Sequence, residues 1–298
     1  MHFRGYLLVL LAALCWGGIG PVSKLAFSEG MAPLEVAFWR AVLGWVFFAL
    51  HAFWGRNFAV KRKDLPAVLF FGVWGVTIFY GAYQLAVSNG GAAIAAVLLY
   101  TAPAWVALLS RMFLAETMTP VKVACVALTM AGVTGVAFGG SGNADIVLSP
   151  LGIASGLVAG FTYAMYYIFG KRVLERYATP TLFLYALPMG ALGLLPFIGL
   201  DIPSKTAFGA LLFLALFSTY GAYSLYYHGL KNLEASRAAV VATLEPVLAG
   251  VMAYLWWDER FTVFGYAGAG LVIVSVLLLV WDEQWGAGRL ARMKRAGG

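Results

Sequence analysis

The chain contains the stretch YGAYQLAVSNGGAAIAAVLLYTAP at residues 80–103, and a related stretch returns 143 positions later as YSLYYHGLKNLEASRAAVVATLEP at residues 223–246. The positions that match in this register include Tyr80 with Tyr223, Tyr83 with Tyr226, Asn89 with Asn232 and Pro103 with Pro246. A register of 147 pairs Trp16 with Tyr163, Lys24 with Lys171 and Pro33 with Pro180. The sequence is therefore written twice, and one copy has lost four residues in an intervening loop.

The composition excludes a water-soluble globular protein. Of the 298 residues, 62% are hydrophobic and 11% are charged, and the mean hydropathy is +0.85, which leaves too little polar surface for a folded domain in water. A bilayer core of about 30 Å needs roughly 20 apolar residues per helix. The predicted membrane spans of about that length are Tyr6–Phe27, Leu34–Trp54, Leu65–Val87, Gly91–Phe113, Pro120–Gly139, Leu151–Gly170, Thr181–Leu200, Thr206–His228, Ala235–Trp257 and Thr262–Trp281.

Each copy of the repeat holds five predicted spans. An odd number of spans places the second copy upside down in the bilayer relative to the first, so the copies are related by an axis in the membrane plane. We therefore predict an all-α integral membrane protein with ten transmembrane helices, arranged as two inverted five-helix repeats at residues 1–143 and 144–285 and followed by a basic cytoplasmic tail at residues 286–298. This architecture is typical of carriers.

The net charge of +7 indicates membrane topology and not an affinity for nucleic acid. With the N-terminus inside, sixteen of the 20 Lys and Arg residues fall on the cytoplasmic side, and only Lys205 and Arg260 lie in outer loops. This positive-inside bias predicts a multi-pass protein with both termini in the cytoplasm. The basic tail anchors the topology in this interpretation, and contact with anionic lipid headgroups is the alternative.

Catalytic and metal-binding patterns are missing from the sequence. No metal site fits the three widely spaced histidines, which are His2, His51 and His228, and no HExxH motif, Walker loop or G-x-S-x-G motif occurs. The two cysteines, Cys15 and Cys125, lie inside predicted spans and provide neither a disulfide framework nor a metal site. We therefore expect no enzyme activity, no cofactor and no metal.

Aromatic residues lie in the middle of several spans, where an interfacial belt does not explain them. A phenol at this depth needs a hydrogen-bond partner or water. Tyr80 and Tyr83 share one face of the third span, and the eighth span repeats their spacing. We predict that these phenols line one central cavity, and simple packing between helices is the alternative. The predicted cavity residues are Trp16, Tyr80, Tyr83, Gln84, Tyr100, Tyr163, Tyr166, Tyr223, Tyr226, Tyr227, His228 and Glu245.

Helix-breaking residues recur within the spans. A break frees backbone groups that only protein or water in a cavity can satisfy, and ordinary proline kinks are the alternative. The predicted breaks are at Gly17, Gly18, Gly20, Pro21, Pro103 and Pro246.

Charged residues also lie within the predicted spans. Glu245 is near the centre of the ninth span, where an ionised carboxylate costs about 3 kcal/mol. It is expected either to bind a substrate amine or carry a proton, or to accept hydrogen bonds from a neighbouring helix; its repeat mate, Ala102, has no charge. Arg40 and Lys24 lie nearer to the ends of their spans, so we expect both side chains to snorkel toward the headgroups.

Four short motifs occur in a characteristic order. They are WGGIGPVSK at residues 16–24, FWR at 38–40, LAET at 114–117 after Pro103, and LEPVLAGVMAYLWWDER at 244–260. With the ten-span plan, over about residues 4–281, the chain resembles the EamA-type members of the drug/metabolite transporter superfamily. The resemblance implies a carrier of the bacterial inner membrane that exports amino acids or other small metabolites by alternating access, with helices one, three, four, six, eight and nine around the central cavity. Within the superfamily the chain is most similar to exporters of aromatic and other hydrophobic amino acids.

The sequence thus predicts a secondary transporter whose partners are a small-molecule substrate and the lipid bilayer. Aromatic residues would stack on the solute, and Glu245 or nearby backbone would meet its ammonium. Efflux of multiple drugs or lipophilic cations is the alternative, because an aromatic box with one buried carboxylate suits such solutes equally well. A membrane-embedded enzyme acting on lipid-linked substrates is disfavoured, since Glu245 has no acidic partner within the spans. The exact substrate, the transport direction, the coupling ion and the oligomeric state stay open.

Overall fold

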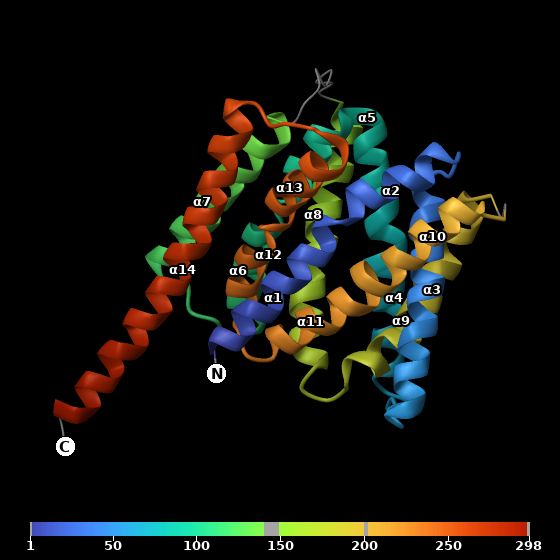
Figure 1. The fold of residues 1–298 in the computed structure, drawn as a ribbon. Helices are drawn as coiled ribbons and strands as arrows, with labels where there is room; N and C mark the ends of the chain where they lie inside the picture. Colours follow the sequence, from blue (N-terminus) through green and yellow to red (C-terminus); the bar gives the residue numbers. More distant parts are fainter. Residues whose placement is uncertain (1, 140–148, 200–201, 297–298) are drawn as a thin grey trace.

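The computed structural model describes residues 2–139, 149–199 and 202–296, and every regular element in those ranges is helical (Figure 1). The first half contains α1 (His2–Gly17), α2 (Ile19–Ser28), α3 (Pro33–Trp54), α4 (Leu65–Gly72), η1 (Val73–Ile78), α5 (Phe79–Leu99), α6 (Ala102–Phe113) and α7 (Pro120–Phe138). The second half contains α8 (Pro150–Val173), α9 (Thr179–Leu194), η2 (Leu195–Phe197), α10 (Lys205–Phe213), η3 (Leu214–Gly221), α11 (Ala222–Leu230), α12 (Ala235–Ala242), α13 (Glu245–Trp257) and α14 (Val263–Ala296). The predicted repeat boundary at residues 143–144 and the predicted span end at Leu200 lie outside the described residues.

Nine helical stretches of the described residues are long and apolar enough to cross a membrane. One of them, Leu65–Leu99, has 35 residues, which is more than a single crossing needs. It is kinked at Gly91, whose φ of 81° and ψ of 160° are not helical, and the third and fourth predicted spans meet at this position. The stretch count is therefore compatible with ten spans, and the all-α membrane fold is confirmed.

Proline and small polar residues set where many of the helices begin. Proline occupies the first turn of α3, α7, α8 and α9, where its missing N–H removes no helical hydrogen bond. Thr119 caps α7 by accepting a hydrogen bond from the Lys122 amide at 3.2 Å, and Ser204 caps α10 in the same way from the Ala207 amide. These signals fix the helix ends on which the rest of the bundle depends.

Two π-helices lie at matching places in the two halves. The segment η1 (Val73–Ile78) leads directly into α5, and η3 (Leu214–Gly221) leads directly into α11. A π-helical turn shifts the phase of the helix that follows it and is frequent at functional sites. In both halves the turn that follows carries the paired tyrosines, Tyr80 and Tyr83 on α5 and Tyr223 and Tyr226 on α11.

Helices of the first half pack mainly against helices of the second half. The helix α1 packs along α11, while α8 packs along α5; α3 packs along α9, and α7 along α14 (Figure 1). In the sequence registers α8 corresponds to α1 and α11 corresponds to α5, so the first two contacts are counterparts of each other. These matching contacts are compatible with two repeats related by a two-fold axis.

Glycines allow α7 and α14 to pack with their backbones in contact. A Cβ added to Gly139 would lie 2.1 Å from the Gly265 nitrogen, and one added to Gly135 would lie 2.8 Å from the Gly268 Cα. The last predicted span ends at Trp281, and α14 continues beyond it to Ala296, with 34 residues in all and a length of about 50 Å. Its C-terminal end and the start of α1 lie at the same end of the molecule (Figure 1).

Candidate substrate-binding site

Aromatic rings from both halves meet between α1, α5, α8 and α11. The Tyr166 ring stacks on Tyr223 with their centroids 5.7 Å apart, and the Trp16 ring contacts Tyr223 at 5.7 Å and Tyr226 at 5.3 Å. The Phe79 ring of α5 contacts Tyr80 at 5.0 Å and Tyr163 of α8 at 5.5 Å. We call this group the tyrosine cluster; its members are Trp16, Tyr80, Tyr83, Tyr100, Tyr163, Tyr166, Tyr167, Tyr223, Tyr226 and Tyr227.

Glu245 joins the tyrosine cluster at a break in a helix. It is the first residue of α13, and Thr243 and Leu244 separate it from α12. The residue is half-buried, and its carboxyl lies near the phenols of Tyr163 and Tyr100. The N-terminus of α13 is the positive end of the helix dipole, which favours a carboxylate at this position. The cluster therefore has one acidic residue, Glu245, at its edge.

Arg40 lies against the same cluster, and the expectation that it snorkels is wrong. Its side chain is only 6% exposed, and its guanidinium carbon lies 6.0 Å from the centre of the Tyr80 ring. The Nε atom is buried without a hydrogen-bond partner. The charge also acts on Glu245 and Tyr223. Distance from the span end along the sequence does not determine the exposure of Arg40, because the face of α3 that carries it packs inward.

Within the cluster, the buried Tyr166 hydroxyl donates to the Gly75 carbonyl of η1 at 2.6 Å, so its phenol is held by backbone. Two other predicted cavity residues are not members of the cluster. Gln84 is half-buried on α5. His228 is exposed, and its Nδ1 lies 2.7 Å from the Ser224 carbonyl of its own helix. His228 therefore points away from the phenols.

The predicted helix-breaking residues lie at three interruptions. Gly17 ends α1 and Gly18 separates it from α2, while Gly20 and Pro21 belong to the first turn of α2. Pro103 and Pro246 are each the second residue of their helices, α6 and α13. The breaks themselves fall at 100–101 and 243–244, which are matching positions of the two repeats.

A pocket of about 670 Å³ opens between α4, the end of α6 and α8; apolar side chains line most of it, and Asp64, Arg172, Glu175 and Arg176 are its charged residues. We call it the Asp64 pocket. Within it the Tyr177 hydroxyl donates to the Asp64 carboxylate at 2.7 Å, and Arg176 pairs with Asp64 at 3.3 Å. These contacts, first Tyr177 and then Arg176, hold the pKa of Asp64 below its usual range.

Stacked rings lie between the Asp64 pocket and the tyrosine cluster. Phe169 lines the pocket and stacks on Phe71 with their centroids 4.5 Å apart. Phe71 in turn contacts the Tyr166 ring at 4.9 Å. The shortest chain of ring contacts from the pocket to the cluster therefore passes through two phenylalanines.

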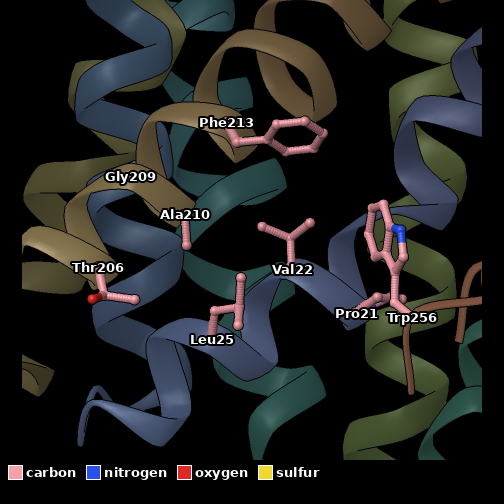
Figure 2. Close-up of a pocket in the computed structure, with 8 residues that line it drawn as sticks. All are labelled: Pro21, Val22, Leu25, Thr206, Gly209, Ala210, Phe213 and Trp256. Atoms are coloured by element: carbon pink, nitrogen blue, oxygen red, sulfur yellow. The ribbon is translucent and has the colours of Figure 1, made fainter.

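A second pocket, of about 640 Å³, is apolar and separate from the cluster (Figure 2). Side chains from α2, α10 and α13 form it, with Phe213 and Trp256 as the large rings. Its only side-chain polar atoms belong to Thr206 and the Trp256 indole. Such a surface suits lipid chains better than a charged solute.

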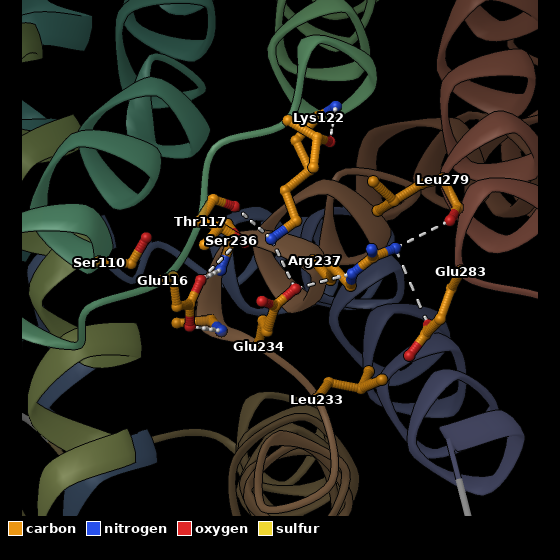
Figure 3. Close-up of polar contacts among 12 residues, drawn as sticks. Ser110, Glu116, Thr117, Lys122, Leu233, Glu234, Ser236, Arg237, Leu279 and Glu283 are labelled. Carbon is orange, nitrogen blue, oxygen red and sulfur yellow. Dashed lines mark hydrogen bonds and ion pairs between the residues drawn. The ribbon is translucent and has the colours of Figure 1, made fainter. Parts of the chain in front are cut away.

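A polar network ties together the ends of α1, α7, α12 and α14 (Figure 3). Glu234 is at its centre and binds Lys122 at 2.6 Å and the Arg237 Nε at 2.8 Å. Arg237 also donates to the Leu279 carbonyl at 3.0 Å and pairs with Asp282. Burial on its own raises the pKa of Glu234, but the two cations outweigh it and leave the pKa below the usual value.

Glu116 of the LAET motif caps α12 within the same region (Figure 3). Its carboxylate accepts hydrogen bonds from the Ala235 and Ser236 amides at 2.5 and 3.1 Å and from the Ser236 hydroxyl at 2.6 Å. Its repeat mate, Glu259, instead pairs with Lys24 at the opposite side of the bundle. Equivalent carboxylates thus make different contacts in the two halves.

Among the described residues, no group of three or more His, Cys, Asp or Glu side chains is arranged to hold a metal ion. The helical bundle, the duplicated breaks and the internal aromatic cluster with its two charges are features of a solute carrier. The model of the EamA-like transporter family matches residues 3–138 and again residues 150–281. The chain belongs to the EamA-like transporter family. The prediction of a membrane transporter rather than an enzyme is thereby confirmed.

Relatives of this EamA-like transporter extend over nearly the whole chain. An uncharacterized transporter of Archaeoglobus fulgidus is 30% identical over 281 residues, which cover 93% of this chain and 99% of that protein. A probable terminal-alkyne amino-acid exporter of Streptantibioticus cattleyicolor is 25% identical over 284 residues, or 91% of each chain. A protein of known crystal structure is similar with a TM-score of 0.81 at 17% identity, covering 93% of this chain and 96% of that one, and this likeness supports the fold alone.

Proposed function

We propose that this transporter exports small amphipathic metabolites, and aromatic or hydrophobic amino acids in particular, by alternating access. The observation that carries the proposal is the tyrosine cluster around Glu245, which combines rings from both halves with a carboxyl at a helix break. Rings of this kind stack on apolar side chains, and a carboxylate near phenols is a partner for an ammonium group. The probable amino-acid exporter among the relatives supports the same substrate class.

The proposed location is a bacterial inner membrane, with both termini in the cytoplasm. The positive-inside distribution of Lys and Arg supports this orientation, and the two ends of the chain lie at the same end of the bundle (Figure 1). In this orientation the Asp64 pocket opens to the cytoplasm. The pocket is then the entry for solute, and the Phe71–Phe169 stack is the barrier that parts during transport.

Efflux of lipophilic cations is the second candidate, because Glu245 and the rings also suit a cation. Arg40 weighs against it, since its positive charge acts on Glu245 within the same cluster. The proposed site therefore has no net negative charge to attract a cation.

Counterflow in proteoliposomes tests the proposal. Liposomes that contain the purified transporter are loaded with unlabelled phenylalanine and diluted into buffer with labelled phenylalanine, leucine or tetraphenylphosphonium. We expect saturable accumulation of the two amino acids above protein-free liposomes. Accumulation of tetraphenylphosphonium alone would favour cation efflux, and no amino-acid flux for any member of a hydrophobic panel would refute the proposed function.

A further inference from the structure

Arg40 is a buried cation that has no hydrogen-bonded counter-ion. It lies within α3, a helix of 22 residues that is one of the candidate membrane spans, and its side chain is 94% buried. The Nε has no partner, and no ion pair to Arg40 is found among the described residues. Its guanidinium carbon lies over the Tyr80 ring, 6.0 Å from the ring centre. Buried charges of this kind are costly unless they are paired, and in membrane spans they mark substrate pathways.

Glu245 and Arg40 are close enough to interact electrostatically, and among the described residues no ion pair joins them. Tyr223, whose ring stacks on Tyr166 at 5.7 Å and contacts Trp16 at 5.7 Å, interacts with both charges. Glu245 is a half-buried residue near the phenols of Tyr163 and Tyr100. Two opposite charges that face one set of rings without meeting are complementary to a solute that carries both charges itself.

We propose that Arg40 binds the carboxylate of the transported solute while Glu245 binds its ammonium group, so that the site selects zwitterions. The assignment rests on the proposed function, because it takes the tyrosine cluster as the substrate site. The apolar part of the solute then lies on the rings, and its two charges satisfy the two buried groups at the same time. A solute with only one charge leaves either the guanidinium or the carboxylate without a partner.

The chemistry of the guanidinium supports this role. It presents a planar fork of donors that matches a carboxylate with two parallel hydrogen bonds, which a lysine ammonium does not reproduce. Arg40 is therefore expected to set specificity through geometry as well as charge, and Arg40→Lys is expected to restore only part of the preference lost in Arg40→Gln.

The test measures binding of three ligands that share one phenyl side chain and differ in charge. The ligands are phenylalanine, its amide, which lacks the carboxylate, and 3-phenylpropionate, which lacks the amine. Dissociation constants are measured by calorimetry on purified full-length transporter in nanodiscs. The readout is the ratio of the amide constant to the phenylalanine constant within each protein, which does not depend on the fraction of protein that is folded. Arg260→Gln, which changes an exposed arginine, is the matched control.

We expect the wild type and Arg260→Gln to bind phenylalanine at least tenfold more tightly than the amide or phenylpropionate. Arg40→Gln is expected to reduce this amide ratio to about one, and Arg40→Lys to give a value in between. A wild-type ratio near one, or a wild-type ratio that survives in Arg40→Gln, would overturn the Arg40 assignment while leaving amino-acid transport intact. Absence of binding for all three ligands, together with absence of counterflow, would overturn the proposed function and the assignment with it.

Discussion

Glu116 and Ser236 are 120 residues apart in the sequence, yet the Glu116 carboxylate accepts hydrogen bonds from both the amide and the hydroxyl of Ser236, at 3.1 and 2.6 Å. A third bond comes from the Ala235 amide. A carboxylate at this place satisfies free N–H groups of the first turn and meets the positive end of the helix dipole. The loop after α6 is thereby attached to the start of α12, the helix that precedes Glu245.

Replacing Glu116 is therefore expected to destabilise the fold more than replacing its repeat mate. Glu116→Ala removes a helix cap and should lower the free energy of unfolding by about 1–2 kcal/mol. Glu259→Ala removes an ion pair with Lys24 whose side chains are both more than 40% exposed, and such pairs contribute about 0–1 kcal/mol. Thermal unfolding in detergent measures both. Equal losses in the two variants would contradict the capping role.

Two buried tyrosines offer a second comparison. The Tyr166 hydroxyl donates to the Gly75 carbonyl of η1, whereas the Tyr226 hydroxyl is buried without a partner. Tyr166→Phe should lower the free energy of unfolding by about 0.5–1.5 kcal/mol, because it removes a buried hydrogen bond. Tyr226→Phe should change it by less than about 0.5 kcal/mol or stabilise the protein. A larger loss in Tyr226→Phe than in Tyr166→Phe would show that the hydrogen-bond assignments are wrong.

The polar network predicts an acid-sensitive contribution to stability. The pKa of Glu234 in the folded protein lies below the ordinary 4.5, so its ionised form stabilises the fold above pH 4.5, and this contribution is lost as the pH falls through the lower folded value. The melting temperature of Glu234→Gln should therefore lie below that of the wild type near neutral pH, and the gap should shrink toward about pH 3. Asp258→Asn, which changes an exposed carboxylate, is the control. A gap that stays constant with pH would rule out this linkage.

Glu245 is expected to matter for transport more than for folding. Glu245→Gln keeps the size of the side chain but removes the charge that binds the substrate ammonium, and a charged hydrogen bond contributes about 1.5–3 kcal/mol. Counterflow of phenylalanine should fall at least tenfold, with a melting temperature close to that of the wild type. Asp258→Asn should transport normally. Normal flux in Glu245→Gln would remove Glu245 from the substrate site.

Hydropathy and the internal repeat were sufficient to predict the membrane fold, because both are carried by residue type and spacing along the chain. The same spacing also placed the breaks, since Pro103 and Pro246 begin matching helices. The π-helices η1 and η3 were not predicted. A π-turn differs from an α-turn by one residue in hydrogen-bond register, and no residue type encodes that difference.

Which residues gather in the tyrosine cluster was predicted in part, and the two departures, Arg40 and His228, have a common physical origin. Arg40 was assigned by its depth, although burial depends on which face of α3 packs inward. His228 was predicted to join the paired phenols, although it follows Tyr226 by two positions and so lies about 200° around the helix from it. Helical phase alone would have excluded His228, whereas Arg40 required the positions of Tyr80 and Glu245 from other helices.

Access to the tyrosine cluster tests the central claim most directly. In a background with Cys15 and Cys125 replaced, one cysteine is placed at Gln84, a half-buried position that follows Tyr83 on α5. Its reaction with a membrane-impermeant thiol reagent is measured with and without phenylalanine. We predict that Gln84→Cys reacts and that phenylalanine slows the reaction at least threefold, while the exposed control Lys205→Cys reacts at the same rate in both conditions. No reaction at Gln84→Cys from either side of the membrane, or a rate that no hydrophobic amino acid changes, would contradict a substrate site at the cluster.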